Sequence, residues 1–241
     1  MDRFQYLDAL EEASAAFFEA VSRCPLSAPV RSCPDWTVAD LVHHLGGVHR
    51  FWGEVVARRL SSPSGVERSQ RPAPEDLVTW AREQAGALQA ALAEAEPTTP
   101  VWTWAAQQEV AFVDRRMAQE TTVHRWDAQL AAGTPERIDP ELASDGVDEF
   151  LTVMVADPRF TAPIGGSVHV HATDTPGEWL ITEGDDGAVV VTREHAKGAV
   201  ALRGPADQLL LGLWGRVPLD DLEIIGDRSV AERLLTRTSL G

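Results

Sequence analysis

The sequence predicts an α plus α/β fold, in which a four-helix bundle at residues 1–156 precedes a small α/β domain at residues 157–241. Two observations support this prediction. Through about residue 155, apolar side chains recur every three or four residues, which is the spacing of amphipathic helices. After Pro158 the pattern changes to short β-branched or alternating runs separated by Gly, Pro and Asp, which is typical of strands and turns.

The first two predicted helices are marked by apolar stripes and by one clear helix start. The stripe of the first helix, at 2–22, contains Phe4, Leu7, Leu10, Ala13, Phe17 and Val21. The second helix begins at Thr37, which forms a T-x-x-D capping box with Asp40 between the hydrophobic-staple residues Trp36 and Leu41. Its stripe contains Leu41, Leu45, Val48, Trp52 and Val55.

Gly46 and Gly47 interrupt the stripe of the second helix. Each lowers helix propensity by about 1 kcal/mol relative to alanine. We therefore expect a close backbone approach at this point of the bundle.

Three further helices are predicted before the pattern changes. Residues 61–73 form a loop by composition, and a helix then covers 74–95. The fourth helix covers about 107–132 and ends at Gly133, a residue type that favours the left-handed backbone of helix ends. Another helix is expected at 139–156.

The C-terminal domain is predicted as strands followed by helices. The expected strands are 167–173, 178–183, 188–194 and 198–204, with a short one near 222–225. The EGDDG segment at 183–187 is typical of a hairpin connection, and helices are expected at 205–213 and 228–237.

Composition restricts the class of partner. The net charge of −16 argues against nucleic acid and anionic membrane surfaces, because both are bound through cationic side chains. No run approaches the roughly 20 apolar residues of a membrane helix, and the acidic N-terminus is unlike a signal peptide. Cys24 and Cys33 are too few for a disulfide framework. We expect a cytoplasmic monomer or homodimer with reduced thiols that acts on a small molecule.

Glu120 and His124 are the strongest indication of chemistry in the sequence. They lie four residues apart on the fourth predicted helix, so their side chains share one face. Val113, Met117 and Ala128 lie on that face too, which makes it the side directed into the bundle. A carboxylate and an imidazole buried together need compensation, which either a divalent cation or a mutual hydrogen bond supplies.

His44 extends this pair to a three-ligand hypothesis. It lies beside Leu41 and Val48 on the apolar stripe of the second helix, so a second histidine points into the bundle. Two histidines and one glutamate suit a catalytic zinc site, which keeps one position open for water or substrate. His43 is rotated by about 100° and is expected to face another helix or water. His49 is poorly spaced for the same metal.

Other polar residues have both a functional and a structural interpretation. Asp127 either holds the His124 imidazole or is a surface acid near the helix end. Cys33 has no neighbouring base, so we do not expect a nucleophile there. His169 and His171 lie on one face of a predicted strand, which suits a metal, but we expect solvated strand residues.

Three tryptophans either line a pocket or belong to the core: Trp52, Trp104 and Trp126.

Five segments carry family-like motifs. In the first domain they are CPDWTVADLVHHLGGVHRFW at 33–52, ETTVHRWD at 120–127 and DPELASDGVDEFL at 139–151. In the second they are GPADQLLLGLWGR at 204–216 and IIGD at 224–227. Together these motifs resemble the mycothiol-dependent maleylpyruvate isomerase family of the DinB-like superfamily. The resemblance implies a DinB-like four-helix bundle with a metal bound by His44, Glu120 and His124.

The resemblance also implies a thiol-using enzyme. Its cofactors would be a divalent metal, with zinc preferred, and mycothiol as a low-molecular-weight co-substrate. The implied activity is cis–trans isomerisation through thiol addition, and the alternative is transfer of mycothiol to an electrophilic small molecule. Family members carry an arginine at the position of Arg216 that is suited to binding a substrate carboxylate. In the alternative, structural interpretation, Arg216 stabilises the interface between the two domains.

Two other classes of function share the same ligand set. Two histidines and one glutamate also bind the zinc of water-activating hydrolases, which need a general base that Asp127 would have to supply. The remaining class is a non-enzymatic, metal-stabilised protein that binds a ligand. The sequence has no motif of serine hydrolases, P-loop NTPases or Rossmann dinucleotide-binding proteins.

Overall fold

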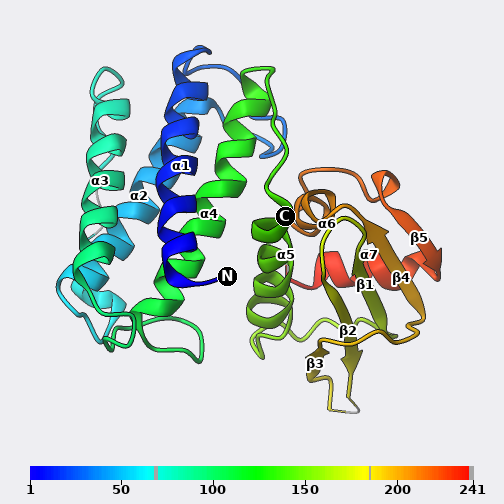
Figure 1. The fold of residues 1–241 in the computed structure, drawn as a ribbon. Helices are drawn as coiled ribbons and strands as arrows, with labels where there is room; N and C mark the ends of the chain where they lie inside the picture. The colour runs from blue at the N-terminus through cyan, green and yellow to red at the C-terminus, as the bar shows by residue number, and fades with distance from the viewer. Residues whose placement is uncertain (68–69, 185, 239–241) are drawn as a thin grey trace. The chain divides into compact units, whose positions relative to one another are not determined.

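The computed structural model describes residues 1–67, 70–184 and 186–238, and the chain divides into two compact units, Met1–Glu136 and Arg137–Gly241. Figure 1 shows long helices running alongside one another in the first unit and a sheet with helices in the second. This is the α plus α/β architecture that the sequence predicts. Among the described residues, no helix combines the length and the apolar character needed to cross a membrane.

Four long helices make up the described part of the first unit, with a short 3-10 turn, η1 (Pro63–Gly65), between the second and the third. They are α1 (Arg3–Ser22), α2 (Val38–Ala57), α3 (Leu77–Glu94) and α4 (Val110–Ala131). Helix α1 packs mainly against α4 and α2 mainly against α3, while α2 and α4 also contact each other. The α2–α4 contact matters most for function, because it brings together the two helices that carry the predicted ligands.

Local signals position these helices. The Thr37 hydroxyl accepts a hydrogen bond from the Asp40 backbone N–H, and the Asp40 carboxylate accepts one from the Thr37 N–H, so the predicted capping box is confirmed. Helix α4 ends before Gly133, whose φ of 77° lies in the left-handed region. Helix α3 starts at Leu77, slightly later than the predicted start at residue 74.

The paired glycines of α2 have different surroundings. A Cβ added at Gly46 would lie 2.5 Å from the Trp80 ring and 3.1 Å from the Ala81 side chain. The predicted close approach is therefore real at this residue and joins α2 to α3. At Gly47 an added Cβ would meet nothing within 4 Å.

The second unit contains a five-stranded sheet in its described residues, with the order β3-β2-β1-β4-β5. The strands are β1 (Val168–Ala172), β2 (Glu178–Glu183), β3 (Val189–Thr192), β4 (Val200–Gly204) and β5 (Glu223–Gly226). Strands β1 and β4 are parallel, and the other neighbouring pairs are antiparallel. The β2–β3 pairing agrees with the predicted hairpin, although residue 185 of its turn lies outside the described residues.

Helices flank this sheet in the sequence and pack on it. They are α5 (Pro140–Glu149), which continues into the π-helix η2 (Phe150–Val155), then α6 (Ala206–Leu213), the 3-10 turn η3 (Leu219–Asp221) and α7 (Arg228–Arg237). Helix α5 packs against α6, and the indole N–H of Trp179 in β2 donates to Asp148 of α5 across 2.9 Å.

The division between the units therefore differs from the predicted boundary at 156/157. Its helical pattern places α5 in the bundle, whereas the structure groups it with the sheet that follows. The physical reason is its apolar face, whose buried Leu142, Ala143 and Val147 belong to a helix that packs on α6.

Candidate metal centre

His44 of α2 and Glu120 and His124 of α4 bring their ligand atoms together in the first unit. The Nε2 atom of His44 lies 3.2 Å from Oε1 of Glu120, and the Nε2 atom of His124 lies 3.3 Å from the same oxygen. Ligand atoms around a tetrahedral zinc ion lie about 3.3 Å apart when each is about 2.0–2.1 Å from the metal. Each imidazole therefore lies at the ligand spacing of a metal site from the Glu120 oxygen, and all three ligand atoms lie within 4.8 Å of one another.

The two helices present their ligands differently. Glu120 and His124 lie one turn apart on α4, and the His124 side chain is only 7% exposed. The side chain of His44 is 36% exposed, whereas Leu41 and Leu45 of the same helix are fully buried. His44 thus lies at the edge of the apolar stripe and not within it, as the sequence suggested. This edge position gives the ligand group an opening to solvent.

Arg116 holds the second oxygen of Glu120. Its Nη2 donates to Oε2 of Glu120 across 2.9 Å, from a residue that is itself buried. Burial raises the pKa of Glu120, but hydrogen bonds with His124 and His44 and the nearby Arg116 charge outweigh it and hold this pKa well below its usual value. Glu120 is therefore a carboxylate that aims one oxygen at the two imidazoles. The R-x-x-x-E-x-x-x-H spacing is the signal that sequence analysis missed.

Asp127 lies behind His124, on the side away from Glu120. Its Oδ2 accepts a hydrogen bond from Nδ1 of His124 across 2.9 Å, and the residue is fully buried, which excludes a surface acid. Burial lowers the pKa of His124, but the hydrogen bonds with Asp127 and Glu120 outweigh it and raise this pKa to about 9. The Cys33 thiol donates to the same Asp127 oxygen over 3.7 Å. A carboxylate in this position fixes the ring so that Nε2 is the atom presented to a metal.

A pocket of about 760 Å³ opens beside His44. Its other lining residues come from α2 and the loop before it, among them Asp35, Trp36, Asp40, Phe51 and Trp52, and the neighbouring His43 also lines it. The Trp36 ring lies 4.9 Å from the His44 ring and is stacked over His124 at 6.4 Å. Trp36, which the sequence indicated only as a helix-start residue, therefore forms a wall next to the ligands.

The neighbouring histidines do not join the ligand group. His43 stacks on Trp80 of α3 with ring centres 5.7 Å apart, so it faces another helix, as its rotation predicts. His49 is buried, and its Nε2 lies 2.8 Å from Oγ1 of Thr121. The rotational argument thus separates the adjacent histidines correctly.

The tryptophans divide between pocket and core. Trp52 lines the pocket, although only 5% of its surface is exposed. Trp104 packs edge-on against Phe112, and Trp126 is buried on α4. Both interpretations of the tryptophans thus apply, each to different residues.

Arg216 follows α6 in the second unit. Its Nη1 donates to the Trp214 carbonyl across 2.7 Å, and its guanidinium lies 5.9 Å from the centre of the Trp214 ring. These contacts are local to the turn, and a role at the metal centre stays a prediction.

Two family models match most of the chain. Residues 7–129 match the mycothiol maleylpyruvate isomerase N-terminal domain, and residues 141–233 match the MDMPI C-terminal domain. The chain belongs to the mycothiol maleylpyruvate isomerase family. His44, Glu120 and His124 lie in the first matched segment of this family, and Arg216 lies in the second.

Two solved structures are similar to this member of the mycothiol maleylpyruvate isomerase family. One is a crystal structure of the mycothiol-dependent maleylpyruvate isomerase, with 13% sequence identity, 93% coverage of each chain and a TM-score of 0.59. The other is a histidine-to-alanine mutant of an enzyme of that name, with 12% identity, the same coverage and a TM-score of 0.60. At these identities the likeness shows a shared fold. No curated protein matches the chain.

Proposed function

We propose that this chain is a metal-dependent enzyme that uses mycothiol to isomerise a cis double bond in a small, carboxylate-bearing molecule. The observation that carries the proposal is the convergence of His44, Glu120 and His124 beside an open pocket. Membership of the mycothiol maleylpyruvate isomerase family supports the thiol and the reaction type.

Zinc is the metal that the donor set fits best. Two imidazoles and one carboxylate suit a zinc site that keeps a position open, and the spacing of 3.2 and 3.3 Å around Glu120 Oε1 agrees with such a site. When bound there, the ion would favour the thiolate form of a coordinated thiol, which is the reactive nucleophile.

The chain's own residues prepare this position. Arg116 binds one oxygen of Glu120 and leaves the other for the centre. Asp127 keeps the Nε2 atom of His124 directed at the same point. Trp36 covers the imidazoles on one side, so that thiol and substrate approach through the pocket at His44.

The reaction requires addition, rotation and elimination at a double bond conjugated to a carbonyl. The thiolate sulfur bonds to one alkene carbon, and the π electron pair moves onto the carbonyl oxygen. Rotation about the resulting single bond follows, and return of the electron pair expels the thiolate unchanged. We propose that Arg216 binds the substrate carboxylate or stabilises the developing negative charge, because a guanidinium pairs with such groups through two hydrogen bonds.

The alternatives use the same residues differently. A mycothiol S-transferase would release the adduct instead of reversing the addition. A zinc hydrolase would need a general base, and Asp127 is poorly suited because it is fully buried and bonded to His124. We place the enzyme in the cytoplasm, as a monomer or homodimer, because a reducing compartment suits Cys24 and Cys33, which form no disulfide, and a reduced low-molecular-weight thiol.

Product analysis tests the proposal. Zinc-loaded protein is incubated with mycothiol and a cis-configured unsaturated keto acid of the maleylpyruvate type, and products are followed by NMR and mass spectrometry. We expect the trans isomer to accumulate while the thiol concentration stays constant.

The other outcomes separate the alternatives. Consumption of thiol with formation of a stable adduct would favour the transferase, and cleavage without thiol would favour the hydrolase. Absence of turnover with a panel of electrophiles would favour a ligand-binding protein. His43→Ala is the matched control for metal loading, because it changes a histidine adjacent to His44 that lines the pocket but does not belong to the ligand group.

A further inference from the structure

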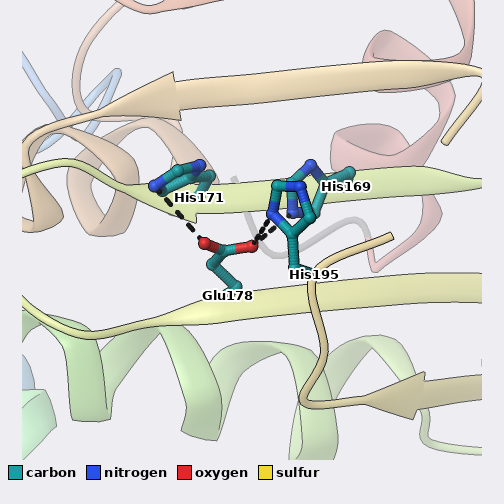
Figure 2. A group of neighbouring side chains, drawn as sticks. All are labelled: His169, His171, Glu178 and His195. Carbon is teal, nitrogen blue, oxygen red and sulfur yellow. Dashed lines mark hydrogen bonds and ion pairs between the residues drawn. The ribbon is translucent and has the colours of Figure 1, made fainter. Parts of the chain in front are cut away.

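A second group of side chains with metal-binding donors lies in the second unit. It consists of His169 and His171 on β1, Glu178 on β2 and His195 in the segment between β3 and β4. Figure 2 shows the three imidazoles arranged around the Glu178 carboxylate. The ligand atoms of the four residues all lie within 4.8 Å of one another.

Strand geometry explains why the first three residues meet. Successive side chains of a strand alternate between the two faces of a sheet, so His169 and His171 share a face. The β1–β2 register places His171 directly opposite Glu178. The alternating residues Val168, Val170 and Ala172 point to the other face and are buried there. The expectation that the two histidines are solvated is wrong for His169, which is only 6% exposed.

His195 completes the group from a different part of the chain. Its Nδ1 lies 2.5 Å from Oε2 of Glu178, although its side chain is 79% exposed. This contact ties the segment between β3 and β4 to the strand pair β1–β2. The fixed position of this exposed side chain beside a single carboxylate calls for an explanation.

Two of the three distances to Glu178 are close to those of a coordination polyhedron, and the His195 contact at 2.5 Å is shorter. The Nε2 atoms of His169 and His171 lie 3.2 and 3.6 Å from the Glu178 oxygens. These separations are close to the value of about 3.3 Å between ligand atoms of tetrahedral zinc. The ring centres of the histidines are 5.4 to 6.4 Å apart, so a single ion can lie between them.

Hydrogen bonding to Glu178 alone explains the group less well. His169 and His195 both meet Oε2, whereas His171 lies 3.6 Å from Oε1, which is too far for a hydrogen bond.

We propose that His169, His171, Glu178 and His195 form a second metal site that binds a first-row divalent transition-metal ion, with Zn²⁺ as the probe. Three imidazoles favour such an ion over Mg²⁺ or Ca²⁺, which prefer oxygen ligands. Four protein ligands fill a tetrahedral zinc site, which is the arrangement of structural sites. The ion joins β1, β2 and the segment that carries His195, and it stabilises the second unit because the ligands assemble only in the folded chain.

Zinc stoichiometry tests this site separately from the first. Purified, chelator-stripped protein is dialysed against Zn²⁺, and bound zinc is measured by elemental mass spectrometry. We expect two ions per chain in the wild type and in the His43→Ala control, and one ion in either His124→Ala or His171→Ala. The double variant His124→Ala/His171→Ala is expected to bind none.

These outcomes distinguish the two sites. A single ion that is lost in His124→Ala and retained in His171→Ala would overturn the second site. A single ion with the opposite dependence would remove the proposed centre at His44, Glu120 and His124 and leave the second site standing.

His195→Ala guards against a folding artefact, because this exposed side chain can be removed without opening the core. We expect zinc affinity at the second site to fall by about tenfold or more, since even residues that only orient a metal ligand contribute about 10–100-fold. Zinc should also raise the unfolding temperature of the His124→Ala variant, and this rise should vanish when His195→Ala is added. A rise that persists in the double variant would show that the ion binds elsewhere.

Discussion

Asp127 accepts a hydrogen bond from Nδ1 of His124 across 2.9 Å, so the opposite ring nitrogen of His124 faces Glu120. The two partners lie three residues apart on α4. An imidazole has two nitrogens, and a buried carboxylate on one of them decides which is free to bind a metal. The proposed first centre therefore depends on a residue outside the ligand group.

Asp127→Asn should weaken zinc binding at the first centre while preserving the shape of the side chain. The expected loss is about 10–100-fold, or roughly 1.4–2.7 kcal/mol, because the neutral amide orients and polarises His124 less well. Competition with a chromophoric chelator measures it. Asp114→Asn is the control, since Asp114 is buried on the same helix but pairs with Arg3 at 3.0 Å. Equal affinity losses in both variants would mean that Asp127 acts only through general stability.

His124→Ala should abolish metal binding at the first centre and the activity that depends on it. His43→Ala should leave the metal in place, because His43 stacks on Trp80 and lies outside the ligand group, and any change in its turnover would come from the pocket wall that His43 lines. Elemental analysis and turnover of the two folded variants check this difference. Equal loss of metal in both would show that the ligand on α2 has been assigned to the wrong histidine.

Arg216→Ala should retain the full metal content but lose most activity toward a carboxylate-bearing substrate. The guanidinium is the group proposed to bind that carboxylate, while the nucleophile does not depend on it. Arg216→Lys keeps the charge but loses the planar pair of donors, so we expect a KM raised by roughly tenfold, equivalent to about 1.4 kcal/mol. Steady-state kinetics with and without a carboxylate on the substrate separate these effects. Normal turnover by the alanine variant would make Arg216 a structural residue of its turn.

Alanine at the two adjacent glycines of α2 should have opposite effects on stability. Gly46→Ala places a methyl group against the Trp80 ring and should lower the free energy of unfolding by about 1–3 kcal/mol. Gly47→Ala meets nothing within 4 Å and should raise it by about 0.5–1 kcal/mol through helix propensity. Urea unfolding monitored by circular dichroism measures both changes. Destabilisation by both substitutions would contradict this account of the α2–α3 contact.

His49 should make the chain less stable in mild acid. Burial lowers its pKa from 6.5 to about 4 in the folded chain, so between these pH values the unfolded chain binds a proton that the folded chain does not. The stability present above pH 6.5 is therefore lost as the pH falls toward 4, by on the order of 2–4 kcal/mol. His49→Gln keeps a polar partner for Thr121 but does not titrate. We expect urea unfolding of this variant to show a smaller decline across that pH range, and an unchanged decline would assign the effect to other groups.

Much of the first centre could be predicted from the sequence, because its determinants are local. The capping box at Thr37 sets the start of α2, and the four-residue spacing of Glu120 and His124 puts both on one face of α4. Both features depend on interactions within one or two helical turns, which a short stretch of residues specifies. The family motifs add His44 of α2 to this pair. Helical periodicity alone could not show that His44 meets Glu120 and His124 of α4.

Tertiary packing decided the remaining features. The edge position of His44, with its opening to the pocket, depends on how α2 packs against α3 and α4. The grouping of α5 with the second unit depends on its contact with α6. The second proposed metal site depends on strand register, which sets His171 opposite Glu178, and on a connection that returns His195 to the same carboxylate. Amphipathic periodicity specifies which face of a helix or strand is buried, but the partner of that face is chosen by contacts between residues far apart in the chain.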